Sequence, residues 1–83
     1  MKAITTKYFG PTNTRGSRIK AYDCDKNSVS IPYDSRLNSE GNHRKAAIAL
    51  AEKMNWHGTL MGGHVDKGMV WVFDGDDRLI AHV

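Results

Sequence analysis

Basic side chains gather in the first half of the sequence, and their chemistry is the easiest to assign. Residues 1–45 hold nine Lys or Arg and four Asp or Glu, a net charge of +5. Residues 46–83 hold three Lys or Arg and five Asp or Glu, a net charge of −2. Guanidinium and ammonium groups bind phosphate and acidic protein surfaces, so we predict an anion-facing contact surface, with a merely solvated surface as the alternative. The candidate partner-binding residues are Arg15, Arg18, Lys20, Tyr22, Arg44 and Lys45.

Three of these residues share one side of a predicted strand. Ile19 and Ala21 alternate with Arg18, Lys20 and Tyr22, which is the pattern of a strand with one face in the core. Tyr and Arg are favoured in binding hot spots. We therefore interpret Tyr22 as part of a contact platform beside the two cations.

The glycine-containing loop at residues 10–17 does not fit a nucleotide-binding motif. The spacing between Gly10 and Gly16 is one residue too long, and Ser17 stands where the motif requires lysine. Polar loops on a small scaffold often carry binding residues. We predict a mobile contact loop that displays Thr12, Asn13, Thr14 and Arg15.

Other residue types with metal-binding or catalytic chemistry are spaced unfavourably. Asp23, Asp25 and Asn27 match the opening of a calcium loop, but Ser28 replaces the required glycine, so a hairpin turn is the better interpretation. No two histidines are three or four residues apart, and a second cysteine is missing. The sequence therefore predicts no catalytic residue, no metal and no cofactor. A small metal-dependent hydrolase or nuclease that uses the aspartates within residues 74–77 is an alternative.

Hydrophobic periodicity predicts the elements that must position these residues. Two-residue alternation favours strands, and apolar residues at helical spacing favour one helix after N-cap candidates at 38–40. We expect strands at about 2–9, 17–22, 29–33, 56–61 and 69–73, a helix at 44–54, a turn at 62–68 and a last short strand at 79–83. The prediction is a single α+β domain, residues 1–83, with an antiparallel sheet of about five strands, one helix packed on one face, and the order β-β-β-α-β-β.

Length and composition exclude several other classes. Eighty-three residues are too few for a dinucleotide-binding fold or a barrel, and 40% hydrophobic with 25% charged residues is typical of a globular chain. Cys24 alone cannot form an intramolecular disulfide, and the longest apolar run, 46–51, is far shorter than the roughly 20 residues of a membrane span. We expect a non-enzymatic cytoplasmic protein without a membrane segment. Homodimerisation is a further possibility, because a core this small contributes little net stability to a monomer.

Three segments resemble a known group of proteins. Residues 1–3 (Met-Lys-Ala), 56–61 (Trp-His-Gly-Thr-Leu-Met) and 68–72 (Gly-Met-Val-Trp-Val) are similar to segments of small phage-encoded anti-CRISPR proteins that inhibit type I-F surveillance complexes (Cascade), and of uncharacterised small phage and plasmid proteins. The resemblance implies a non-catalytic protein that grips the Cascade backbone subunits and blocks target-DNA hybridisation, with contact residues on the helix. The basic residues of the predicted helix are Arg44, Lys45 and Lys53.

Two functions follow from these residues. The first is inhibition of a host CRISPR-Cas surveillance complex in the host cytoplasm, by covering a surface that nucleic acid normally occupies. The second is a small basic nucleic-acid-binding module, whose affinity for DNA or RNA would fall as salt rises.

Overall fold

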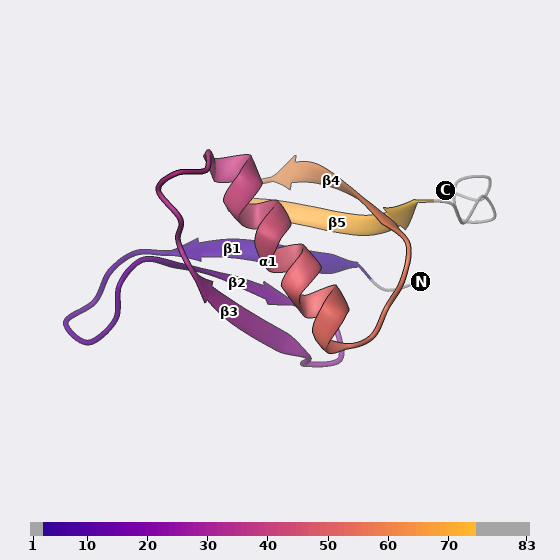
Figure 1. Cartoon of the computed structure of the whole chain (residues 1–83), viewed down its shortest axis with the longest axis horizontal. Coiled ribbons are helices and arrows are strands. Elements are labelled where there is room, and N and C mark those ends of the chain that lie inside the picture. The colour runs from indigo at the N-terminus through magenta and orange to yellow at the C-terminus, as the bar shows by residue number, and fades with distance from the viewer. Residues whose placement is uncertain (1–2, 75–83) are drawn as a thin grey trace.

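The fold is an antiparallel sheet with one helix lying across it (Figure 1). The computed structural model describes residues 3–74. Its elements are β1 (Ile4–Phe9), β2 (Arg18–Tyr22), β3 (Ser28–Pro32), α1 (Ser39–Lys53), β4 (Thr59–Val65) and β5 (Gly68–Asp74). The strand order is β3-β2-β1-β5-β4, and all neighbours are antiparallel. The predicted fold class and element order are therefore confirmed, whereas the strand expected at 79–83 lies outside the described residues.

The core lies between α1 and the face of the sheet that α1 covers. Every second residue of the central strands enters it, as the two-residue alternation predicted. Its buried apolar residues are Ile4, Ile19, Ala21, Met69 and Trp71 from the sheet, and Ala46, Ala47, Leu50 and Ala51 from α1. Because α1 contributes mainly alanines to this contact, the helix lies close to the strands.

A capped first turn makes α1 begin at Ser39, earlier than the expected residue 44. Asn38 Oδ1 accepts a hydrogen bond from the Gly41 N–H at 2.7 Å, which is N-cap geometry. The buried Asn42 Oδ1 accepts from the Asp34 N–H at 2.7 Å, and its Nδ2 donates to the Asp34 carbonyl at 2.9 Å. These bonds compensate for the weak helix propensity of Gly41 and Asn42. The predicted cap region, 38–40, is confirmed.

The β4–β5 hairpin is longer than expected, and its turn lies elsewhere. β4 begins at Thr59 instead of the expected residue 56 and continues to Val65, so the turn consists of residues 66–67 instead of 62–68. Gly62 suggested a turn in the sequence, but it lies within β4 opposite Trp71. A Cβ at Gly62 would be 2.5 Å from two atoms of the Trp71 ring. The glycine therefore gives room to a core side chain.

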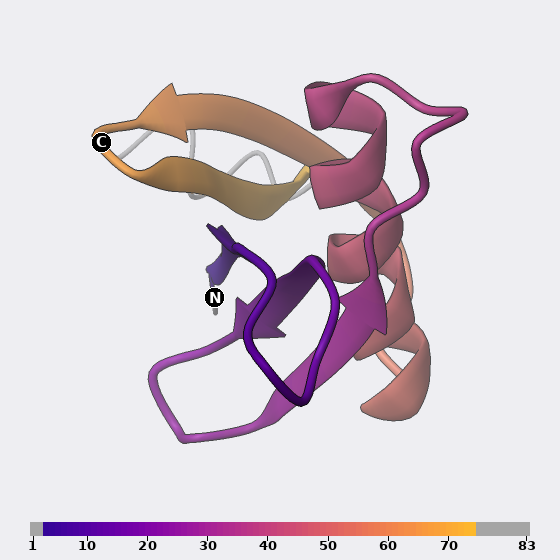
Figure 2. The same cartoon turned by 90° about the vertical axis from the view of Figure 1, so that its left-hand side faces the viewer.

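The second face of the sheet is uncovered by any helix or strand of residues 3–74. α1 packs against β1, β2, β3 and β5. Figure 2 shows it on one side of the sheet, with no other described element on the opposite side. An antiparallel sheet with one open face presents every second residue of its strands there. This open face carries the candidate site.

Candidate nucleic-acid interface

Basic and aromatic side chains of β1 and β2 gather on the open face of the sheet. On β2, Ile19 and Ala21 are fully buried toward α1, so the residues that alternate with them point away from it. Residues of β1 join them through the antiparallel β1–β2 register. We call this surface the basic-aromatic platform and define it as Lys7, Phe9, Arg18, Lys20 and Tyr22.

Each cation of the platform lies over an aromatic ring. The Arg18 Cζ is 5.3 Å and the Lys7 Nζ 5.7 Å from the centroid of the Phe9 ring. The Lys20 Nζ is 5.9 Å from the centroid of the Tyr22 ring. Such contacts contribute about 0.5–1 kcal/mol each at exposed sites. They hold the long cationic side chains along the sheet.

The platform concentrates positive charge without neutralising it. Lys7 and Lys20 face each other directly across the β1–β2 pair, and like charges in this position destabilise an antiparallel pair. Among the side chains of residues 3–73, no Asp or Glu forms a salt bridge with Lys7, Lys20 or Arg18, and the salt bridges found there lie elsewhere. The platform is therefore complementary to a polyanion.

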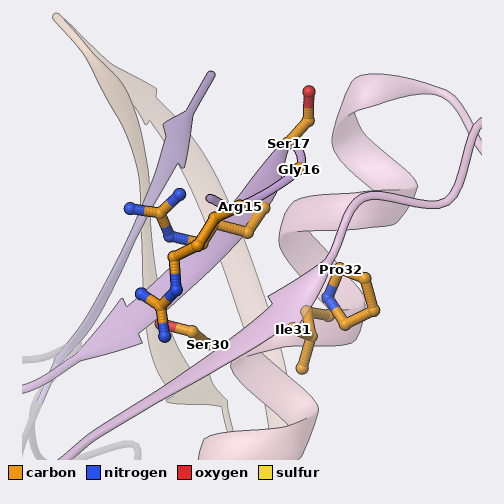
Figure 3. A pocket seen from close by; sticks show the side chains of 7 residues that line it. Arg15, Gly16, Ser17, Ser30, Ile31 and Pro32 are labelled. Carbon is orange, nitrogen blue, oxygen red and sulfur yellow. The ribbon is translucent and has the colours of Figure 1, made fainter. Parts of the chain in front are cut away.

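A hollow of about 290 Å³ adjoins the platform at the start of β2 (Figure 3). Residues from the end of loop 10–17, from β2 and from β3 line it: Arg15, Gly16, Ser17, Arg18, Ser30, Ile31 and Pro32. Arg18 belongs to both the platform and the hollow. Its Nη1 is buried and has no hydrogen-bond partner within residues 3–74.

The loop that carries Arg15 extends beyond the ends of β1 and β2 (Figure 1) and is folded on itself. The Thr12 N–H donates to the Arg15 carbonyl at 2.7 Å, and Thr12 Oγ1 accepts from the Arg15 N–H at 3.0 Å. The Tyr8 hydroxyl donates to Ser17 Oγ at 3.1 Å, which ties the end of the loop to β1. These bonds bring Arg15 to the lining of the hollow. The contact role of the loop stays a prediction.

The six candidate residues do not form one surface. The sheet side holds Arg15, Arg18, Lys20 and Tyr22. The helix side holds the exposed Arg44 and Lys45 of α1, on the other side of the sheet (Figure 2). Charge counted along the sequence does not show which layer a residue joins, so the predicted basic surface is divided in two.

Neighbouring groups partly engage the cations on the helix side. Lys45 Nζ lies 3.9 Å from Asp34 Oδ2, and Arg36 donates to both carboxylate oxygens of Asp34 at 3.1 Å. The Arg36 hydrogen bonds lower the pKa of Asp34 to about 2, so this carboxylate is ionised at neutral pH. Lys53 Nζ donates to the Ser28 carbonyl at 2.8 Å. Lys45 and Lys53 therefore already have polar partners on this side.

Sequence reasoning missed two residues of the platform, Lys7 and Phe9. The two-residue period of β1 was visible, since both alternate with Ile4 and Thr6, which are buried. The missing information was the register. Only the β1–β2 pairing sets these two side chains beside the cations of β2.

A buried chain of hydrogen bonds fixes β1, and with it Lys7, against α1 and β5. The Trp71 Nε1–H donates to Thr6 Oγ1 at 3.0 Å, and Thr6 Oγ1 lies 2.8 Å from His43 Nδ1. The Thr6 hydroxyl also donates to the Met69 carbonyl at 3.4 Å, so one side chain of β1 contacts both α1 and β5. Burial, with a smaller effect of His64, lowers the pKa of His43. The chain of bonds is therefore formed around a neutral imidazole.

The aspartates that suggested a calcium loop form a hairpin turn. Asp23 Oδ1 accepts from the N–H groups of Asp25 and Asn27, each at 2.9 Å, and its Oδ2 accepts from Asn27 Nδ2 at 2.8 Å. In the described part of the chain, no three His, Cys, Asp or Glu side chains gather where they could hold a metal ion. Asp76 and Asp77, which the hydrolase alternative requires, lie outside the described residues.

Comparisons with protein-family models, curated proteins and solved structures found no match for this chain. Among residues 3–74, no helix has the length and apolar character needed to cross a membrane.

Proposed function

We propose that the protein is a non-catalytic binding protein whose basic-aromatic platform binds a single-stranded nucleic acid. One observation carries this proposal: Lys7 lies directly opposite Lys20, and neither forms a salt bridge with a carboxylate of residues 3–73. This pairing destabilises the free sheet. A phosphate backbone laid along the lysine pair would replace their repulsion with attraction.

The aromatic rings favour a single strand over a duplex. Phe9 and Tyr22 are partly exposed and flank the lysine pair on the same face. Unpaired bases stack on aromatic rings and on guanidinium planes, and each such stack contributes about 1–3 kcal/mol. Bases in a duplex already stack on one another, so the rings would add little to duplex binding.

Fluorescence anisotropy with a labelled single-stranded oligonucleotide at several salt concentrations tests the charge of the platform. Each phosphate contact contributes about 0.7 to the slope of log affinity against log salt for a single strand. We expect Lys7→Ala/Lys20→Ala to lower this slope by about 1.4, which is two contacts. The control Arg44→Ala/Lys45→Ala removes the same charge from the helix side and should leave the slope unchanged. Equal losses in both variants would refute the platform.

A separate variant tests the rings. Tyr22→Leu keeps an apolar side chain and removes the stacking surface. We expect a loss of about tenfold in affinity for the single strand, at the lower end of the stacking range, with an unchanged salt slope. A slope that changes, or affinity that stays the same, would contradict a stacking role.

A second proposal is inhibition of a type I-F CRISPR-Cas surveillance complex in the host cytoplasm. The exposed Arg44 and Lys45 on the outer side of α1 support it, because the resemblance implies contact residues on the helix. The assay is target-DNA binding by the purified complex with this protein added. We expect Arg44→Ala/Lys45→Ala to relieve inhibition and Lys7→Ala/Lys20→Ala to retain it. Absence of inhibition by the wild-type protein would remove this proposal.

A further inference from the structure

We infer that the hollow beside the platform is a binding site for a phosphate group, an inference that rests on the proposed function for the source of that phosphate. The hollow has a volume of about 290 Å³ and is lined by two arginines, two serines, Gly16, Ile31 and Pro32, with no carboxylate among them (Figure 3). Such a lining has donors for an anion and no side-chain charge that would repel one.

Arg18 supplies an unused donor at this site. Its Nη1 is buried and has no hydrogen-bond partner within residues 3–74. Its guanidinium is held over the Phe9 ring, with Cζ 5.3 Å from the ring centroid. A buried donor without an acceptor is unfavourable. Because Arg18 lines the hollow, a phosphate bound there would place an acceptor beside this guanidinium.

The remaining donors come from two other segments. Arg15 lies in the folded loop, whose turn is closed by hydrogen bonds between Thr12 and Arg15. Ser17 Oγ points away from the arginine side chains and accepts from the Tyr8 hydroxyl, so it is not counted among these donors (Figure 3). Ser30 enters from β3. Donors that approach from separate segments suit a phosphate group, whose several oxygens point in different directions, better than a planar carboxylate.

The register connects the hollow to the platform. Ser30 pairs with Lys20, and Pro32 pairs with Arg18, across the β2–β3 ladder. A single-stranded nucleic acid lying over Lys7 and Lys20 can therefore place one of its phosphates in the hollow while it stays in contact with the sheet. Both an internal phosphodiester and a terminal phosphate have the required chemistry.

Titration with inorganic phosphate, followed by NMR of backbone amides and arginine Nε–H groups, tests the site without any nucleic acid. Sodium chloride at matched ionic strength is the reference. We expect saturable shifts at Arg15, Gly16 and Arg18 that exceed those at Arg44, and loss of these shifts in Arg15→Ala. Arg15 is exposed in a loop, so its replacement leaves the core intact. Shifts that do not saturate, or that chloride reproduces, would overturn the inference.

Oligonucleotides with a 5′-phosphate or a 5′-hydroxyl then distinguish the sources. Tighter binding of the phosphorylated form by several-fold, abolished in Arg15→Ala, would assign a terminal phosphate. Equal binding of both forms, weakened several-fold in Arg15→Ala, would assign an internal phosphodiester. Oligonucleotide binding that depends on Lys7 and Lys20 but not on Arg15 would refute the hollow and leave the platform standing. Phosphate shifts without oligonucleotide binding would refute the proposed function and leave the phosphate site standing.

Discussion

Reversing one charge of the lysine pair should make the protein more stable and a weaker binder. In Lys20→Glu, the new carboxylate would lie directly opposite Lys7 in the β1–β2 register. Cross-strand charge pairs contribute about 0.2–1 kcal/mol with either sign. We take about 0.5 kcal/mol for the lost repulsion and about 0.5 kcal/mol for the new attraction.

The loss of one ring contact reduces this gain. The Lys20 Nζ is 5.9 Å from the Tyr22 ring centroid, near the outer limit for a cation–π interaction, so we assign it about 0.5 kcal/mol. The net expectation is a free energy of unfolding that rises by about 0.5 kcal/mol, or a Tm higher by about 2–4 °C for a domain of this size. The gain should shrink in 1 M salt, where the Debye length is about 3 Å.

Calorimetry and denaturant titration measure the stability change, and anisotropy measures the salt slope for a single-stranded oligonucleotide. The same variant should lose at least one phosphate contact, which is a slope smaller by about 0.7. Arg44→Glu is the control on α1. It makes the same change in net charge, and we expect no gain in stability there, because Glu40 lies one turn earlier on the helix. A destabilised Lys20→Glu protein, or one that binds with an unchanged slope, would refute the reasoning.

Three further predictions concern the scaffold that holds the platform. Since burial lowers the pKa of His43, the unfolded chain takes up a proton below the ordinary pKa of 6.5 that the folded chain does not. The free energy of unfolding should therefore fall as pH drops below that value, by at most about 1.4 kcal/mol per pH unit. Denaturant titrations of His43→Gln should show a flatter pH dependence. Gly62→Ala places a Cβ 2.5 Å from Trp71 ring atoms and should lower the free energy of unfolding by about 1–3 kcal/mol. The control Gly63→Ala, with no atom within 4 Å of its Cβ, should change this free energy little. Similar values for both variants would contradict the packing described. Asn42→Ala removes a buried side chain that bonds the Asp34 backbone at two points, and thermal unfolding should show a loss of about 2–3 kcal/mol; a loss below about 1 kcal/mol would mean that these bonds are replaced.

Local patterns in the sequence were sufficient to predict the fold class. Alternation in β2 predicted that Ile19 and Ala21 enter the core. The cap candidates at 38–40 marked the true start of α1, although the apolar spacing alone placed the first helical residue at 44. The glycines at 62–63 misled the placement of the turn, because glycine serves both turns and close packing. Only the partner across the strand, Trp71, decides which of these applies.

Only part of the candidate site could be predicted from the sequence. Arg18, Lys20 and Tyr22 lie two residues apart on one strand, so their common face could be predicted from β2 alone. Lys7 and Phe9 joined them through a register that no local pattern determines. The buried contact between Thr6 and His43 spans 37 residues and is equally invisible to local reasoning.

The most direct test of the central claim is NMR mapping of a single-stranded oligonucleotide onto the ¹⁵N-labelled protein. We predict that the shifts concentrate on β1 and β2, with the Arg18 side chain and the amides around Lys7 and Lys20 among the largest, while the outer side of α1 stays unperturbed. Shifts centred on Arg44 and Lys45, or no saturable shifts at low salt, would contradict the platform as the binding surface.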